Sequence, residues 1–211
     1  SESVSPLEWA KLLRQCWADP QIHRGPLEVW QKSLAANAAA GGRACSSLLQ
    51  VFKKLGFHVQ LPGVKQGSYD FVLEDNVLVQ SKSRQITTPE SPVVVKLQRS
   101  PGHNGGARLW RQYRPSEFHL LTVCMLDKQH LDLLGFWAIP IDDLVQWGKV
   151  GQVGKNSASL TLCHPDGISS RQRSHEQQLL LRKFFFDPEK VCKDKRESER
   201  LAKIIARCRR V

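Results

Sequence analysis

The sequence has no apolar run close to the roughly 18 consecutive residues that a membrane-spanning helix needs. Its start lacks the pattern of a secretory signal. Its six cysteines include no CxxC pair, and no histidines stand at zinc-finger spacing from them. We therefore expect reduced thiols in an intracellular compartment, without a disulfide framework, a zinc finger or a membrane role. A nucleus and a bacterial cytoplasm both fit this expectation.

Acidic residues are also scarce relative to basic ones. The 211 residues include 31 Lys and Arg but only 20 Asp and Glu, which gives a net charge of +11. Residues 1–40 carry four basic and four acidic side chains, whereas residues 77–117 carry seven and two, and residues 187–211 carry nine and five. An excess of this size favours a polyanionic partner such as nucleic acid.

Local patterns divide the chain into three parts. Residues 1–40 are expected to be a helical segment, because Ser5 to Glu8 form a capping box and a second helix follows Pro26. The glycines at 41 and 42 are expected to separate this segment from an α/β core at residues 41–186. Residues 187–211 are expected to form a basic helical segment, with an apolar stripe of Leu201, Ile204, Ile205 and Cys208.

The expected core alternates helices and strands. A helix with Leu48 and Phe52 on its inner face should end at Gly56, and a strand should follow at 57–61. Residues 83–107 are expected to be a long connection, interrupted by the β-prone Val93 to Val95. Further strands are expected at 118–126, 135–139 and 157–163, with a short helix at 140–147. The result is a buried mixed sheet flanked by helices.

The segment from Tyr69 to Lys82 predicts a hairpin with polar groups gathered on one face. If residues 74–76 form the turn, Leu73 lies opposite Val77, Phe71 lies opposite Val79, and Asp70 lies opposite Gln80. Directly opposite β-carbons are about 5 Å apart. Lys82 lies two residues further along the polar face, so a carboxylate, an amide oxygen and an ammonium group should converge.

A hairpin that carries Asp70 and then the triplet Gln80-Ser81-Lys82, after a helix and a strand, resembles the PD-(D/E)XK superfamily of nucleases. The resemblance covers about residues 41–147 and implies a restriction-endonuclease-like fold. It also implies that Asp70 and Gln80 hold Mg²⁺ or Mn²⁺ and that Lys82 orients or helps to deprotonate the attacking water. The chain departs from the family pattern at Gln80, where an amide replaces a carboxylate, although some members use Gln there. It departs again on the helix, where Ala44 and Cys45 stand in place of Glu.

Basic side chains follow the hairpin directly, where a phosphate backbone would approach. The expected nucleic-acid contacts are Arg84, Lys96, Arg99, Arg108, Arg111 and Arg114. DNA is the expected partner, and RNA remains an alternative. Two coordinated cuts would require two active sites and would therefore favour a homodimer.

These patterns together predict a divalent-metal-dependent DNA endonuclease with Asp70, Gln80 and Lys82 as its catalytic residues. One alternative is a nuclease-fold domain that has lost metal affinity and binds nucleic acid without cutting it. A second alternative is a protein-interaction domain that uses its tryptophans and its basic face. Metal binding separates the first function from the others, and salt-sensitive binding to nucleic acid separates the two alternatives.

Overall fold

The computed structural model describes residues 24–62, 69–74, 76–88, 91–98, 111–151, 158–165 and 182–209, of which 24–38 are described by their backbone alone. The chain divides into two compact units, Ser1–Ala39 and Ala40–Val211, and each is described by itself. The helix expected after Ser5 lies outside the described residues. The boundaries expected at 40 and 186 stay predictions.

The helix α2 (Arg24–Lys54) is continuous through Gly41 and Gly42, so these glycines do not interrupt the helix, although the two compact units meet just before them. Each glycine inside a helix costs about 1 kcal/mol relative to alanine. Ala40, Ala44 and Leu48 are buried at a spacing of four residues, and this packing offsets the cost. The helix ends as expected at Gly56, whose φ is +82° and whose N–H donates to the carbonyl of Lys53 at 3.0 Å.

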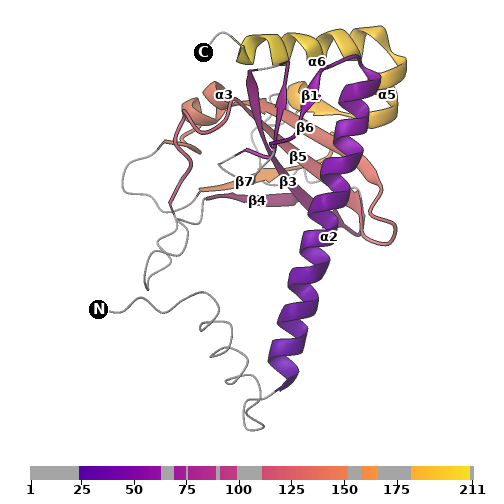
Figure 1. The fold of residues 1–211 in the computed structure, drawn as a ribbon, viewed down its shortest axis with the longest axis vertical. Helices are drawn as coiled ribbons and strands as arrows, with labels where there is room; N and C mark the ends of the chain where they lie inside the picture. The colour runs from indigo at the N-terminus through magenta and orange to yellow at the C-terminus, as the bar shows by residue number, and fades with distance from the viewer. Residues whose placement is uncertain are drawn as a thin grey trace. The chain divides into compact units, whose positions relative to one another are not determined.

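A mixed sheet of six strands forms the centre of the second unit, in the order β1-β2-β3-β5-β6-β8 (Figure 1). Strands β3 and β5 run parallel, and the other neighbouring pairs are antiparallel. The strands are β1 (Val59–Gln60), β2 (Phe71–Leu73), β3 (Val77–Ile86), β5 (Leu120–Asp127), β6 (Leu133–Pro140) and β8 (Phe185–Phe186). This sheet confirms the expected mixed α/β fold class.

A second sheet pairs β4 (Val93–Leu97) with β7 (Ala158–Leu162) in antiparallel register. The β-prone residues Val93 to Val95, expected to interrupt the long connection at 83–107, lie in β4, and β3 extends into the start of this range as far as Ile86. Val93, Val95 and Leu97 are buried and alternate with exposed residues, which is the pattern of a strand with one covered face. The strand expected at 157–163 is confirmed as β7.

The hairpin of β2 and β3 has the register that the sequence predicts. Phe71 pairs with Val79 and Leu73 pairs with Val77, and all four side chains are fully buried. Glu74 takes a positive φ of 53°, and the N–H of Asn76 donates to the carbonyl of Leu73 at 3.3 Å. The turn therefore fixes which side chains of β3 share a face with Asp70.

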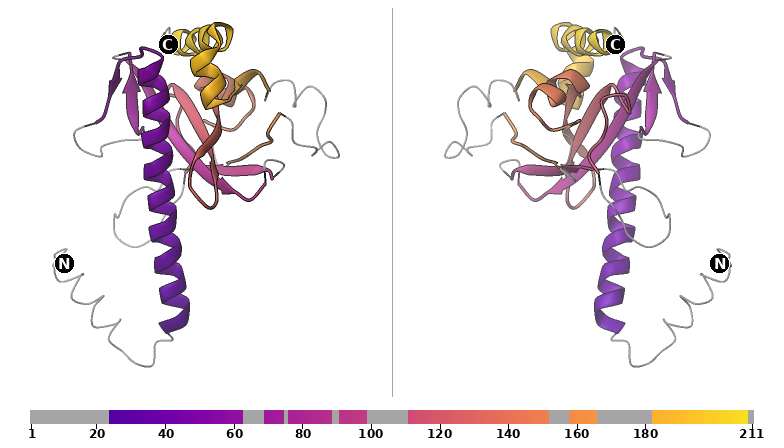
Figure 2. Two further views of the ribbon diagram at one scale, coloured as in Figure 1. Left: turned by 90° about the vertical axis from the view of Figure 1, so that its right-hand side faces the viewer. Right: turned by 90° about the vertical axis from the view of Figure 1, so that its left-hand side faces the viewer.

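The C-terminal turns of α2 run beside the sheet (Figure 2). The ring of Phe52 lies 5.9 Å from that of Phe71 and 6.2 Å from that of Phe136, measured between centroids. Because side chains alternate along a strand, Gln80 and Lys82 point to the face opposite α2. The chain thus buries an apolar face against the helix and directs Gln80 and Lys82 to the other face.

The described residues of this unit also include the helices α3 (Ile141–Gln146), α5 (Pro188–Lys193) and α6 (Lys195–Cys208). The apolar stripe expected on the last helix is confirmed, since Leu201, Ile204, Ile205 and Cys208 are all buried. Arg209 forms an ion pair with Glu74 at 2.6 Å, and Arg207 forms one with Asp143. These pairs join the C-terminal helix to the hairpin turn and to α3. Within the described residues, no helix combines the length and the apolar character needed to cross a membrane.

Candidate nuclease site

Asp70 and Gln80 are in direct contact, as the hairpin register predicts. The Nε2 atom of Gln80 donates to Oδ2 of Asp70 at 2.5 Å and to the main-chain carbonyl of Ser81 at 3.0 Å. The backbone N–H of Ser81 donates to the same Asp70 oxygen at 2.7 Å. Gln80 is only 6% exposed, whereas Asp70 is half-buried. The amide is therefore held in the sheet and the carboxylate lies at its surface.

Lys82 reaches this pair through a tyrosine that sequence reasoning missed. The Nζ atom of Lys82 donates to the hydroxyl of Tyr113 at 3.2 Å, and this hydroxyl donates to Oε1 of Gln80 at 3.2 Å. The ammonium also lies 5.5 Å from the centroid of the Tyr113 ring. Asp70, Gln80 and Lys82 are thus linked by one chain of hydrogen bonds, and Tyr113 supplies the link.

Tyr113 is fixed by packing and not only by its hydroxyl. Its side chain is 4% exposed, and its ring meets that of Phe118 edge to face, with centroids 5.2 Å apart and planes at 84°. The residue lies just before β5, which pairs in parallel with β3 and so brings this segment next to Gln80 and Lys82. A sequence signal for this contact is lacking because the partners are more than 30 residues apart.

The two positions of α2 that the resemblance to PD-(D/E)XK nucleases matches to an acid hold no carboxylate. Ala44 is buried and Cys45 is half-buried. Burial, and then the negative charge of Asp70, raise the pKa of the Cys45 thiol. Burial also raises the pKa of the Cys124 thiol to about 12, although a hydrogen bond with Ser81 opposes the rise. Both thiols therefore stay protonated at neutral pH, the form in which a cysteine is a poor metal ligand.

Asp70 is consequently the one carboxylate in the hydrogen-bonded chain. Among the described residues, no three His, Cys, Asp or Glu side chains lie close enough to hold a metal ion. Any cation at this position would depend on neutral oxygen ligands beside Asp70. The amide of Gln80 and the carbonyl of Ser81 are oxygen ligands of that kind.

The expected phosphate-binding residues differ in their surroundings. Arg84, Lys96 and Arg114 are exposed, and Nε of Arg84 donates to the carbonyl of Val94 at 2.8 Å. Arg111 donates to both oxygens of Glu117, at 2.8 and 2.6 Å, and its hydrogen bond to this carboxylate raises the pKa of the guanidinium. A phosphate contact by Arg111 would have to compete with that bidentate pair. Arg99 and Arg108 lie outside the described residues.

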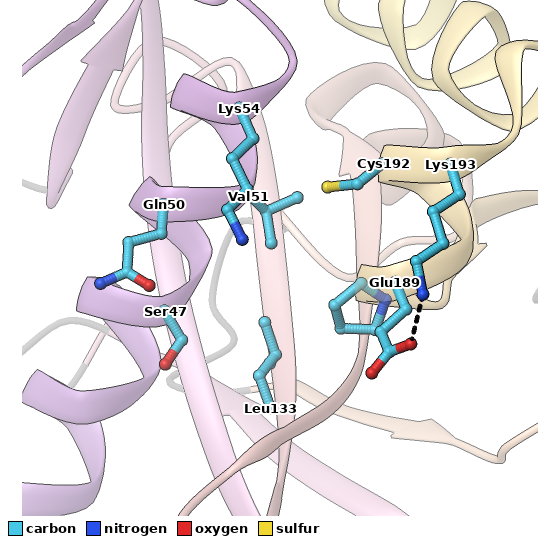
Figure 3. Close-up of a pocket in the computed structure, with 9 residues that line it drawn as sticks. Ser47, Gln50, Val51, Lys54, Leu133, Glu189, Cys192 and Lys193 are labelled. Atoms are coloured by element: carbon cyan, nitrogen blue, oxygen red, sulfur yellow. Dashed lines mark hydrogen bonds and ion pairs between the residues drawn. The ribbon is translucent and has the colours of Figure 1, made fainter.

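A groove of about 400 Å³ lies between α2 and α5 (Figure 3). Glu189 and Lys193 form an ion pair at 2.9 Å on its α5 side, and Lys54 and Gln50 lie on its α2 side. Its lining residues are Ser47, Gln50, Val51, Lys54, Leu133, Pro188, Glu189, Cys192 and Lys193. The hairpin residues and Tyr113 are not among them, so the candidate site lies elsewhere.

No protein-family model and no curated protein matches the chain. Among solved structures, the chain is similar to a bacterial homing endonuclease, I-Ssp6803I, with a TM-score of 0.47 and 20% identity over 69% of this chain and 93% of that one. It is also similar to MepB, with a TM-score of 0.45 and 16% identity over 61% of this chain and 86% of that one. At these values the similarity concerns the course of the backbone and says nothing about chemistry.

Proposed function

We propose that the protein is a divalent-metal-dependent DNA endonuclease whose site consists of Asp70, Gln80 and Lys82. The observation that carries this proposal is the convergence of the three side chains on one hydrogen-bonded chain. A carboxylate, an amide and an ammonium in contact suit the hydrolysis of a phosphodiester, an anion whose charge grows in the transition state. The net charge of +11 supports a polyanionic substrate.

The residues present fit a hard cation. Nε2 of Gln80 stands 2.5 Å from a carboxylate oxygen and 3.0 Å from a carbonyl oxygen, so a positively polarised group already occupies this position. Asp70, the carbonyl of Ser81 and, after rotation of its amide, Oε1 of Gln80 would supply three oxygen ligands. A bound Mg²⁺ or Mn²⁺ would polarise the phosphate and lower the pKa of a coordinated water.

Lys82 would act on the charge of the substrate. Its ammonium is held by two neutral groups, the hydroxyl and the ring of Tyr113, so these contacts leave its charge uncompensated. A half-buried ammonium next to the scissile phosphate stabilises negative charge as it develops and helps to orient the attacking water. Its position on β3, two residues from Gln80, gives it a fixed direction relative to Asp70.

The test is a cleavage assay on supercoiled plasmid and on DNA and RNA oligonucleotides, each with Mg²⁺, Mn²⁺ or EDTA. Wild-type protein should cut DNA with either metal and should lose the activity in EDTA. Asp70→Ala should lower the rate by about 10² or more, because it removes the one carboxylate of the site. Asp132→Ala, at an exposed turn, is the matched control and should cut normally. Equal rates for both variants and the wild type would disprove the assignment of the site.

One observation favours the alternative of a domain that binds nucleic acid without cutting it. The amide of Gln80 satisfies Asp70 directly, so the pair forms a closed set of hydrogen bonds without any cation. The alternative predicts salt-sensitive binding to nucleic acid together with no cleavage and no Mg²⁺ binding. Calorimetric titration with Mg²⁺ therefore decides between the two functions even if the preferred DNA sequence is not among the substrates.

A further inference from the structure

The hydrogen bonds between Lys82 and Asp70 can run in only one direction. An ammonium only donates and a carboxylate only accepts, so the two ends of the chain have fixed roles. The hydroxyl of Tyr113 must accept a hydrogen bond from Lys82, so its own proton is available for donation to Oε1 of Gln80. Nε2 of Gln80 must therefore point toward Asp70.

We propose that Tyr113 is the positioning residue of this site. In the metal-free protein its hydroxyl fixes the orientation of the Gln80 amide and holds the Lys82 ammonium next to it. A bound cation would have to turn the amide over, and the hydroxyl would still accept from Lys82. The expected effect of Tyr113 on cleavage rests on the proposed function. Its effect on the orientation of Gln80 does not, because that orientation is a property of the protein without metal or DNA. Tyr113 acts through Gln80 and Lys82.

The surroundings of Tyr113 suit such a role. A hydroxyl can accept one hydrogen bond and donate another at the same time, which the relay between Lys82 and Gln80 requires. The ring is buried against Phe118, so the hydroxyl cannot swing away from the two side chains. Tyr113→Phe removes only the hydroxyl and keeps the edge-to-face contact with Phe118. This substitution therefore tests the hydrogen bonds separately from the packing of the ring.

The first measurement reads the orientation of Gln80 without any activity. The side-chain amide of Gln80, recorded by NMR on protein with ¹⁵N-labelled glutamine, is identified as the signal that disappears in Gln80→Glu. In the wild type its protons should exchange slowly with water. Tyr113→Phe should speed this exchange by about fivefold or more, the factor that corresponds to a lost hydrogen bond. Tyr69→Phe removes the hydroxyl of the other tyrosine in the chain and should leave the exchange unchanged.

The second measurement reads the effect on cleavage. Tyr113→Phe should lower kcat by about 10 to 100-fold at saturating Mg²⁺, with KM for DNA and the unfolding midpoint unchanged, because it misplaces Lys82 without removing a substrate contact. Wild-type exchange of the Gln80 amide in Tyr113→Phe, or a wild-type kcat in an active preparation, would overturn the proposal. If the wild type neither cuts a substrate nor binds Mg²⁺, the proposed function fails and the exchange measurement alone decides the role of Tyr113.

Discussion

The side-chain nitrogen of Gln80 lies 2.5 Å from a carboxylate oxygen of Asp70. A glutamate at position 80 would instead bring two carboxylates together, and two such groups in contact cannot both be ionised unless a cation separates them. With a neutral amide at position 80, the carboxylate of Asp70 can stay ionised next to it without a metal ion. This difference leads to the first prediction.

Gln80→Glu should tighten Mg²⁺ binding and make the stability of the protein depend on the Mg²⁺ concentration. Without metal, Asp70 should raise the pKa of the new carboxyl group above its unfolded-state value. The folded state then binds more protons than the unfolded state, so stability should fall as the pH rises through this interval. Mg²⁺ should reverse the fall. The measurement is the thermal midpoint in Mg²⁺ and in EDTA at several pH values, together with calorimetric titration.

The control for this substitution is Gln85→Glu, which makes the same change at an exposed position of the same strand. It should not change the dependence of the midpoint on Mg²⁺. If Gln80→Glu and Gln85→Glu respond equally to Mg²⁺, Gln80 is not a ligand in the proposed site.

Lys82→Ala should abolish most cleavage while leaving Mg²⁺ affinity close to that of the wild type. The lost group stabilises charge in the transition state and is not an oxygen ligand, so the expected fall in kcat is about 10² to 10³-fold. Calorimetry with Mg²⁺ and a single-turnover cleavage assay provide the two readings. Lys128→Ala, in the exposed turn after β5, is the control. A large loss of Mg²⁺ affinity in Lys82→Ala would contradict the separation of roles.

The hairpin could be predicted from the sequence because its determinants are local. The apolar side chains of Phe71, Leu73, Val77 and Val79 alternate, and a three-residue turn fixes the register between them. A register one residue away would expose all four. The contact between Asp70 and Gln80 follows from this register, and the pattern of the C-terminal helix is equally local.

The contacts that escaped prediction are those made across long distances in the chain. Tyr113 contacts Lys82 because β5 lies parallel to β3, and no local pattern in either segment indicates this pairing. The pairing of Arg111 with Glu117 depends on the path of an irregular segment. The continuity of α2 through its two glycines depends on tertiary packing, which outweighs local propensity.

The third prediction tests whether the core of the hairpin is as buried as its register implies. Phe71→Ala should lower the free energy of unfolding by about 3 to 5 kcal/mol, since the ring is fully buried against Phe52. Leu61→Ala, at a side chain that is 65% exposed, should change it by less than about 0.5 kcal/mol. Urea unfolding followed by circular dichroism measures both. A loss below about 1 kcal/mol for Phe71→Ala would place the ring outside a packed core.

The last prediction concerns the basic side chains that follow the hairpin, and the structure divides them by whether their charge is already paired. Arg84, Lys96 and Arg114 are exposed, while the guanidinium of Arg111 is held by Glu117.

If Arg84, Lys96 and Arg114 neutralise phosphates, replacing all three with alanine should flatten the dependence of log K on log salt by up to about three units for duplex DNA. Binding should weaken by a similar factor for every sequence, because phosphate contacts carry no sequence information. Arg111→Ala should change the slope less and lower the thermal midpoint more, since it breaks a bidentate pair with a largely buried carboxylate. Fluorescence-anisotropy titrations at several salt concentrations measure the slope. An unchanged slope in the triple variant would move the DNA-binding surface away from the hairpin, with the basic helix α6 as the next candidate.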